Sequence, residues 1–137
     1  MQRAETKARV RALQLLYAWD LTGRPPLKTV VVRVAGMYGQ APVQPDRSAE
    51  LAAKGIAGLA DFDQLVSAAA EHWRLERVGI IERNILRLAL AELAEGGTPC
   101  RVVIDEAVRL AQWFAGAKAP GFVNGVLDTA ARQLGAL

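Results

Sequence analysis

Hydrophobic side chains recur on two faces of the first predicted helix, which spans residues 3–22 and ends before Gly23 and Pro25. At about 100° per residue, one apolar face contains Ala8, Ala12, Leu15, Leu16 and Trp19. The second apolar face, nearly opposite, contains Val10, Leu13, Tyr17 and Leu21. Between them remains a narrow strip with Arg3, Lys7, Arg11, Gln14 and Ala18, while Arg9 lies on the other side. A helix with two apolar faces is expected to pack centrally and to leave its cationic strip open to solvent.

Capping residues indicate two shorter helices further along the chain. Asp46 or Ser48 can cap a helix that runs to about residue 59. Asp61 or Asp63 can cap the next, which runs to about residue 73. These side chains accept hydrogen bonds from the first free amides of a helix, so their positions predict where each helix begins.

A longer amphipathic helix is predicted over residues 78–95. Its core face contains Val78, Ile81, Ile85, Leu88, Ala89 and Leu93. Its opposite, charged side contains Glu76, Arg83 and Arg87, with Glu82 beside them. Thr98 and Pro99 then begin a helix whose expected inward side chains are Val103, Ala107, Leu110 and Phe114. The last helix starts near Pro120 and is expected to bury Val123, Val126, Leu127, Ala130 and Leu134.

Residues 24–45 do not follow the helical pattern. Residues 29–34 are rich in β-branched side chains, which favour a strand, and Pro42 and Pro45 close the segment as a loop. An isolated strand would have no pairing partner in an otherwise helical chain. The strand propensity of residues 29–34 therefore conflicts with the helical pattern of the rest of the chain.

Composition indicates one domain over residues 1–137 with a sizeable core, because 52% of the residues are hydrophobic. The single cysteine, Cys100, excludes an intramolecular disulfide. No secretory signal or membrane-spanning run is found, so a cytoplasmic location is expected. The net charge is +3, and four cations fall in the first eleven residues. Such a cluster indicates a polyanion partner or a solvated helix start.

Catalytic and metal-binding motifs are not found in the sequence. His72 is the only histidine, and with Cys100 it provides too few ligands for a zinc site. No phosphate-binding or nucleophile-elbow motif occurs, so neither a cofactor nor a catalytic residue is predicted. The neighbours Asp105 and Glu106 point about 100° apart and cannot act as one dyad. Glu92 falls on an apolar face, so it is expected to pair with an arginine or a helix N-terminus.

An aromatic side chain near the start of the last helix is a candidate for RNA contact. Phe122 lies beside the apolar line of this helix, with Lys118 before it and Asn124 following it. Nucleobases stack on such rings, although Phe122 can instead act as a hydrophobic staple on the first helix. Gly121 and Gly125 form a G-x-x-x-G spacing, which in this chain is expected to permit close helix packing.

Three blocks of sequence, in matching order, resemble the NusB family of bacterial transcription antitermination factors. Residues 102–128 contain VVIDEAVRLAQWFAGAKAPGFVNGVLD, similar to the family pattern I-[ND]-E-A-V-x-L-A followed by F-V-N-G-V-L-D. Residues 12–21, ALQLLYAWDL, resemble the family's first helix. Residues 83–93, RNILRLALAEL, resemble its central helix. The resemblance implies an all-α, compact bundle of about seven helices, with a second helix near residues 26–38.

The resemblance also implies partners. In NusB-like proteins a basic N-terminal segment and the F-V-N-G region bind single-stranded boxA RNA. The matching residues here are Arg3, Lys7, Arg9, Arg11, Gln14, Tyr17, Lys118, Phe122 and Asn124. The second partner would be NusE, a ribosomal protein, and the residues implied for it are Glu76, Glu82, Arg83 and Arg87. The implied activity is suppression of premature termination by RNA polymerase, chiefly on ribosomal RNA operons.

Several alternatives stay open beside this resemblance. Glu5, Thr6 and Val10 dilute the basic segment, and Gly121 replaces the polar residue often found before Phe122 in relatives. The chain can also be a helical protein-binding adaptor without RNA binding. The same fold occurs at the N-terminus of RNA cytosine methyltransferases, but a chain ending at residue 137 is not expected to include their catalytic domain. Core packing is an alternative role for Tyr17, and homodimerisation through the basic face is left open.

Overall fold

The computed structural model describes residues 3–37, 46–70 and 78–136, and every regular element in these ranges is a helix. The seven helices are α1 (Ala4–Leu21), α2 (Leu27–Met37), α3 (Arg47–Ala57), α4 (Leu59–Ala69), α5 (Ile80–Glu95), α6 (Cys100–Phe114) and α7 (Ala119–Gln133). The expected all-α bundle of about seven helices is thus confirmed. Over the described ranges, no helix is both long and apolar enough to cross a bilayer.

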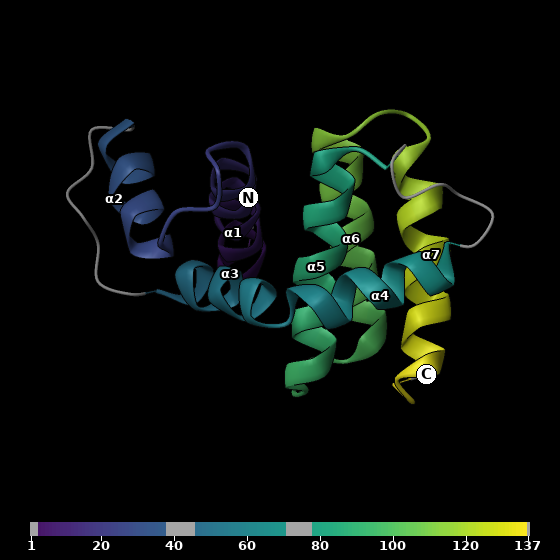
Figure 1. The fold of residues 1–137 in the computed structure, drawn as a ribbon. Coiled ribbons are helices and arrows are strands. Elements are labelled where there is room, and N and C mark those ends of the chain that lie inside the picture. Colours follow the sequence, from purple (N-terminus) through teal and green to yellow (C-terminus); the bar gives the residue numbers. More distant parts are fainter. Residues whose placement is uncertain (1–2, 38–45, 71–77, 137) are drawn as a thin grey trace.

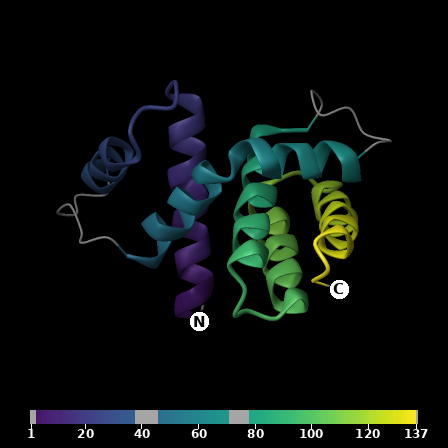
Figure 2. The same ribbon diagram turned by 60° about the horizontal axis from the view of Figure 1, so that its bottom comes forward.

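Helix α5 is the centre of the bundle. It packs against α1, α3, α4, α6 and α7, and every residue from Asn84 to Glu92 is buried. Helices α6 and α7 lie together on one side of α5, whereas α1 and α2 lie on the other (Figure 1). Helices α3 and α4 run across these two halves (Figure 2). One hydrophobic cluster includes side chains from all seven helices, so the described residues share a single core.

The expectation that α1 is packed from both sides is only partly correct. Its first apolar face is buried, since Ala12, Leu15, Leu16 and Trp19 are at most 5% exposed. Its second face is partly open, because Leu13 is buried whereas Tyr17 is 38% and Leu21 57% exposed. The helix surrounded by others is α5, and α1 forms one wall of the bundle.

Helix α2 shows that packing overrides local propensity in residues 24–45. Val30 is 2% and Ala35 8% exposed, and both lie against the rest of the protein. A β-branched residue costs only about 0.5 kcal/mol relative to alanine inside a helix. Burying a valine side chain contributes about 1.5–3 kcal/mol, so the apolar face determines the outcome. The helix implied by the family resemblance is confirmed, and the strand favoured by propensity is wrong.

Helix starts agree with the sequence at α3 and differ at α4 and α6. The Asp46 carboxylate accepts a hydrogen bond from the Ala49 amide at 3.1 Å and caps α3. Helix α4 begins directly after Gly58, so Asp61 and Asp63 lie inside the helix and do not cap it. The Asp63 carboxylate instead pairs with a buried arginine of α5. Helix α6 begins after Pro99, one position later than the Thr98 cap predicts.

Candidate nucleic-acid interface

A line of exposed polar side chains follows the open face of α1. We define it as the basic ridge, formed by Arg3, Lys7, Arg11 and Gln14, all of which are exposed. Its members recur every three or four residues because the buried face of α1 contacts α3 and α5. At 1.5 Å of rise per residue, Arg3 and Arg11 are separated by about 12 Å along the helix axis.

The cations of the basic ridge are not neutralised by nearby acids. Within residues 3–37, 46–70 and 78–136, Arg3, Lys7 and Arg11 form no ion pair. The field of Arg11 does reach Asp46: a hydrogen bond from Ser48 is the main cause lowering the Asp46 pKa, and Arg11 contributes to the same shift. Three positive charges thus face solvent in a row, an arrangement that attracts a polyanion.

Arg9 does not belong to this ridge, which corrects the RNA contact expected for it. Two residues of a helix lie about 200° apart, so Arg9 points inward while Lys7 and Arg11 point outward. Its side chain is 11% exposed, and its Nε and Nη2 atoms donate to the Glu92 carboxylate at 2.6 and 2.8 Å. This hydrogen bonding raises the pKa of Arg9 above its usual value. The predicted pairing of Glu92 with an arginine is confirmed.

A third helix joins this buried pair. Glu106 of α6 accepts a hydrogen bond from the Thr6 hydroxyl at 3.0 Å, and its Oε1 atom lies 3.8 Å from Arg9 Nη1. Thr6 is 1% and Glu106 9% exposed. Glu106 therefore forms an ion pair within the protein, with Arg9. Together these polar contacts join α1 to α5 and α6 directly beneath the basic ridge.

An apolar groove lies alongside the ridge, between α1, the start of α5 and the end of α6. Its volume is about 260 Å³, and its lining residues are Val10, Leu13, Gln14, Tyr17, Ile81 and Phe114. Tyr17 is thus a wall of this groove and not a core residue, unlike Trp19. Phe114 was expected to face inward, yet it is 42% exposed. It is the last residue of α6, where the flanking helices no longer cover it. We call this feature the α1–α6 groove.

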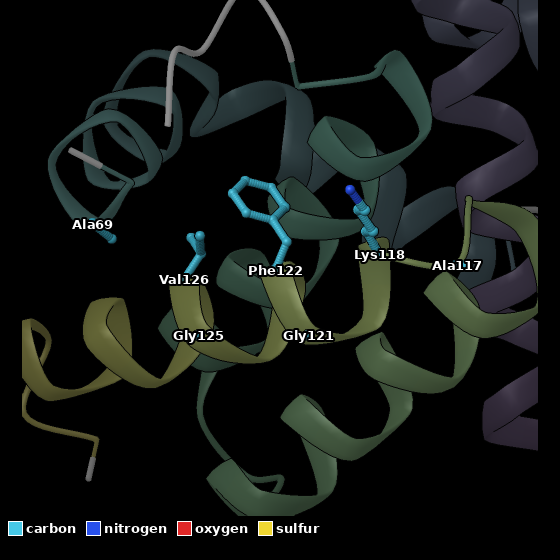
Figure 3. Close-up of a pocket in the computed structure, with 7 residues that line it drawn as sticks. All are labelled: Ala69, Ala117, Lys118, Gly121, Phe122, Gly125 and Val126. Atoms are coloured by element: carbon cyan, nitrogen blue, oxygen red, sulfur yellow. The ribbon is translucent and has the colours of Figure 1, made fainter. Parts of the chain in front are cut away.

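A second pocket surrounds the start of α7 (Figure 3). This α7 pocket has a volume of about 600 Å³ and is lined by Ala69, Ala117, Lys118, Gly121, Phe122, Gly125 and Val126. Phe122 is half-buried and projects toward the α4 side, where Ala69 lies (Figure 3). Phe122 also packs against the hydrophobic core, and its alternative role as a staple on α1 stays a prediction. Lys118 is exposed beside it, and Asn124 is exposed but does not line the pocket.

The two glycines of α7 serve this pocket and not helix packing. A Cβ atom built on Gly121 or Gly125 would have no heavy atom within 4 Å beyond its own surroundings in the helix. The expected close approach of another helix at the G-x-x-x-G spacing is therefore wrong. Both glycines line the α7 pocket and contribute no side chain to it.

The basic ridge and the α7 pocket are separate surfaces. Helices α5 and α6 lie between α1 and α7 in both ribbon views (Figures 1 and 2). A nucleic acid that contacted both surfaces would therefore have to extend past α5 and α6.

The residues implied for a protein partner are divided by the structure. Glu76, like His72, lies outside the described residues. Glu82 is half-buried, and its carboxylate accepts a hydrogen bond from the Gly79 amide at 2.9 Å at the start of α5. Arg83 is half-buried one residue further on. Both side chains therefore keep part of their surface exposed to solvent.

Arg87 is not a surface residue, which corrects its expected role in docking. Its side chain is 1% exposed and donates to both oxygens of Asp63, at 2.8 and 2.9 Å, and to Asp20 at 3.0 Å. Burial alone would raise the pKa of Asp20, but hydrogen bonds from Arg24 and Arg87 outweigh burial and lower it. Arg87 therefore joins α5 to α1 and α4 inside the bundle.

Comparisons with known proteins agree with this architecture. A sequence model described as the NusB family matches residues 6–132. The transcription antitermination protein NusB of Solibacter usitatus (strain Ellin6076) is 40% identical over 131 residues, covering 93% of this chain and 88% of the relative. A structure of T. maritima NusB has a TM-score of 0.78 at 28% identity, covering 97% of this chain and 94% of that one. A structure of the antitermination factors NusB and NusE in complex with dsRNA has a TM-score of 0.76 at 29% identity, covering 97% and 99%.

The described residues form an all-helical bundle with a row of exposed cations, an arrangement typical of proteins that bind polyanions. The chain belongs to the NusB family, whose model covers nearly all of it and whose Solibacter member is 40% identical. The resemblance noted in the sequence is thereby confirmed. Because the relatives are named as transcription antitermination proteins, the prediction of a non-enzymatic transcription factor is confirmed too.

Proposed function

We propose that this protein binds boxA-type single-stranded RNA together with NusE and helps RNA polymerase read through terminators, chiefly on ribosomal RNA operons. The observation that carries the proposal is the basic ridge, whose Arg3, Lys7 and Arg11 face solvent without an ion-pair partner among the described residues. Cations held in this way release counterions when they meet phosphates, and this release provides salt-dependent affinity.

Choice of RNA sequence would come from the groups next to the cations. Gln14 has an amide donor and acceptor for a base edge, and Tyr17 exposes an aromatic ring. Lys118, Phe122 and Asn124 extend this set to α7. Single-stranded RNA fits these groups best, since its bases can leave the stack and lie on aromatic side chains.

The protein partner is proposed from the relatives. One similar structure is a complex of NusB and NusE with dsRNA. For this chain we propose that NusE contacts the start of α5, where Glu82 and Arg83 lie, together with Glu76 before it. Arg9 and Arg87 are left out of both interfaces because they are buried. A cytoplasmic location, a single domain and assembly with RNA polymerase accompany this proposal.

The test is a salt titration of RNA affinity. Fluorescence anisotropy would be measured with a labelled boxA-type oligoribonucleotide, single-stranded or annealed to its complement, with and without purified NusE. We expect tighter binding of the single strand, an affinity that falls steeply with salt, and a gain when NusE is added. A protein that binds NusE but no RNA at low salt would be a helical adaptor. Light scattering of the free protein would detect a homodimer that RNA dissociates.

A further inference from the structure

The α1–α6 groove combines features that suit one planar, partly polar ligand. Its lining is mostly apolar, with Val10, Leu13 and Ile81 beside the rings of Tyr17 and Phe114. Gln14 is the one amide side chain among its lining residues, which include no carboxylate. The volume of about 260 Å³ lies just below the roughly 300–1,000 Å³ of pockets that enclose drug-sized ligands. A single heterocycle is the right size for such a space.

The groove is also continuous with the basic ridge. Gln14 belongs to both, and Arg11 precedes it by about 4.5 Å along the helix axis. A ligand that occupies the groove therefore lies within one helical turn of an unpaired cation. In a nucleotide the base is covalently joined to an anionic phosphate, so both parts would be accommodated at once.

Resting on the proposed function, we propose that the α1–α6 groove is a nucleobase pocket that takes one unstacked base of the bound RNA. The base lies against Phe114, with Tyr17 as the second aromatic wall, and its edge exchanges hydrogen bonds with the Gln14 amide. Phe114 is thereby assigned as a stacking residue. The RNA strand passes from the phosphates held by the ridge across the groove toward Lys118 at the start of α7.

The exposed aromatic area supports this assignment. Phe114 is 42% exposed although it ends a helix whose other inward positions are almost fully buried, such as Ala107 at 4% and Leu110 at 2%. Its ring is held edge-on by Trp113, with ring centroids 6.2 Å apart and an interplanar angle of 85°. A ring fixed in this way keeps its orientation before the RNA arrives, which reduces the entropy lost on binding.

The test compares Phe114→Ala with Val102→Ala, a control that removes an equally exposed hydrophobic side chain on the same helix from outside the groove. The probe is a boxA-type single-stranded oligoribonucleotide, measured by anisotropy at several salt concentrations. Phe114→Ala should weaken binding about tenfold, as expected for loss of one stacked base, and leave the salt slope unchanged. Phe114→Leu, which keeps apolar bulk, should recover folding but not affinity. Urea unfolding of each variant separates misfolding from loss of contact.

A second arm locates the base. Each nucleotide of the probe is replaced in turn by an abasic one. At a single position the abasic probe should bind the wild type about tenfold more weakly and should remove the effect of Phe114→Ala, because both changes delete the same contact. If Phe114→Ala binds every probe as the Val102→Ala control does, the pocket is not used and the inference is overturned while the proposed function stands. If Phe114→Ala weakens NusE binding alone, the groove holds a protein side chain and the inference is overturned too. Absence of RNA binding by the wild type would overturn both proposals.

Discussion

The guanidinium of Arg9 and the carboxylate of Glu92 form a two-point contact between α1 and α5, with Nε 2.6 Å from Oε1 and Nη2 2.8 Å from Oε2. Both side chains are largely shielded from water, at 11% and 3% exposure. Removing one member of a buried ion pair leaves the other charge without compensation. This cost exceeds the net contribution of the intact pair to stability.

Arg9→Ala is therefore expected to lower the free energy of unfolding by about 3 kcal/mol, because Glu92 would be left buried without its partner. Urea denaturation followed by circular dichroism measures this change. Lys7→Ala, two residues away and exposed, is the matched control and should change stability by less than about 0.5 kcal/mol. A variant Arg9→Ala that unfolds like the wild type yet loses RNA affinity would show that Arg9 contacts RNA instead.

The basic ridge gives a prediction about salt. Replacing Lys7 and Arg11 together with alanine should reduce the slope of log affinity against log salt by about 0.7 for each lost phosphate contact with single-stranded RNA. Lys28→Ala on α2, an exposed lysine away from the ridge, should leave this slope unchanged. Equal slopes for the double variant and the wild type would remove the ridge from the RNA interface.

Glu95 gives a prediction about acid stability. Hydrogen bonds from Arg47 and Lys54 lower the pKa of Glu95 from 4.5 to about 2. Because the folded-state pKa lies below the unfolded one, this contribution to stability is present above pH 4.5 and is lost as the pH falls toward 2. Since Arg47 and Lys54 are both more than one-third exposed, the contribution is on the order of 1 kcal/mol or less.

Glu95→Gln should therefore have a lower melting temperature than the wild type at pH 6, and the two curves should converge near pH 2. Thermal unfolding over this pH range measures the difference, with high salt expected to narrow it at pH 6. A difference that stays constant down to pH 2 would exclude titration of Glu95 as its cause.

Glycine substitutions distinguish the α7 pocket from a packing contact. Gly125→Ala should stabilise the protein by about 0.5–1 kcal/mol, because the position is helical and has nothing within 4 Å of the new methyl group. Gly96→Ala is the contrasting variant: space is also open there, but its φ of +77° strains any other residue. Thermal unfolding should therefore show opposite shifts. A destabilised Gly125→Ala would indicate that another element packs on this face.

Much of the α1 surface was predictable from the sequence, since the spacing of Arg3, Lys7 and Arg11 determines that they share a face. The pairing of Glu92 was predictable as well, because a carboxylate on an apolar face requires a partner. The identity of that partner was not, since Arg9 lies 83 residues away and its proximity depends on how α1 packs on α5. The same packing buries Arg9, which is why it is left out of the proposed RNA-binding residues.

Arg87 and Phe114 show what a helical wheel leaves out. A helical wheel shows which residues share a face of a helix, but not which other helices pack against that face. Because five helices pack around α5, even its charged position at Arg87 is buried. Its acidic partners, Asp20 and Asp63, come from two other helices. Phe114 continues the inward line of α6, yet exposure at a helix end depends on where the flanking helices stop. Helix α2 was predictable from the family resemblance only, because its valines favour a strand locally.

The contact between Arg9 and Glu92 also fixes how α1 is rotated about its own axis. Burial of Leu15, Leu16 and Trp19 already opposes rotation of α1, and a rotation by one position would swing the outward cations by about 100°. The two-point geometry of a guanidinium on a carboxylate tolerates no such roll. The ion pair on the buried side of α1 thus keeps the exposed cations facing outward before any nucleic acid binds.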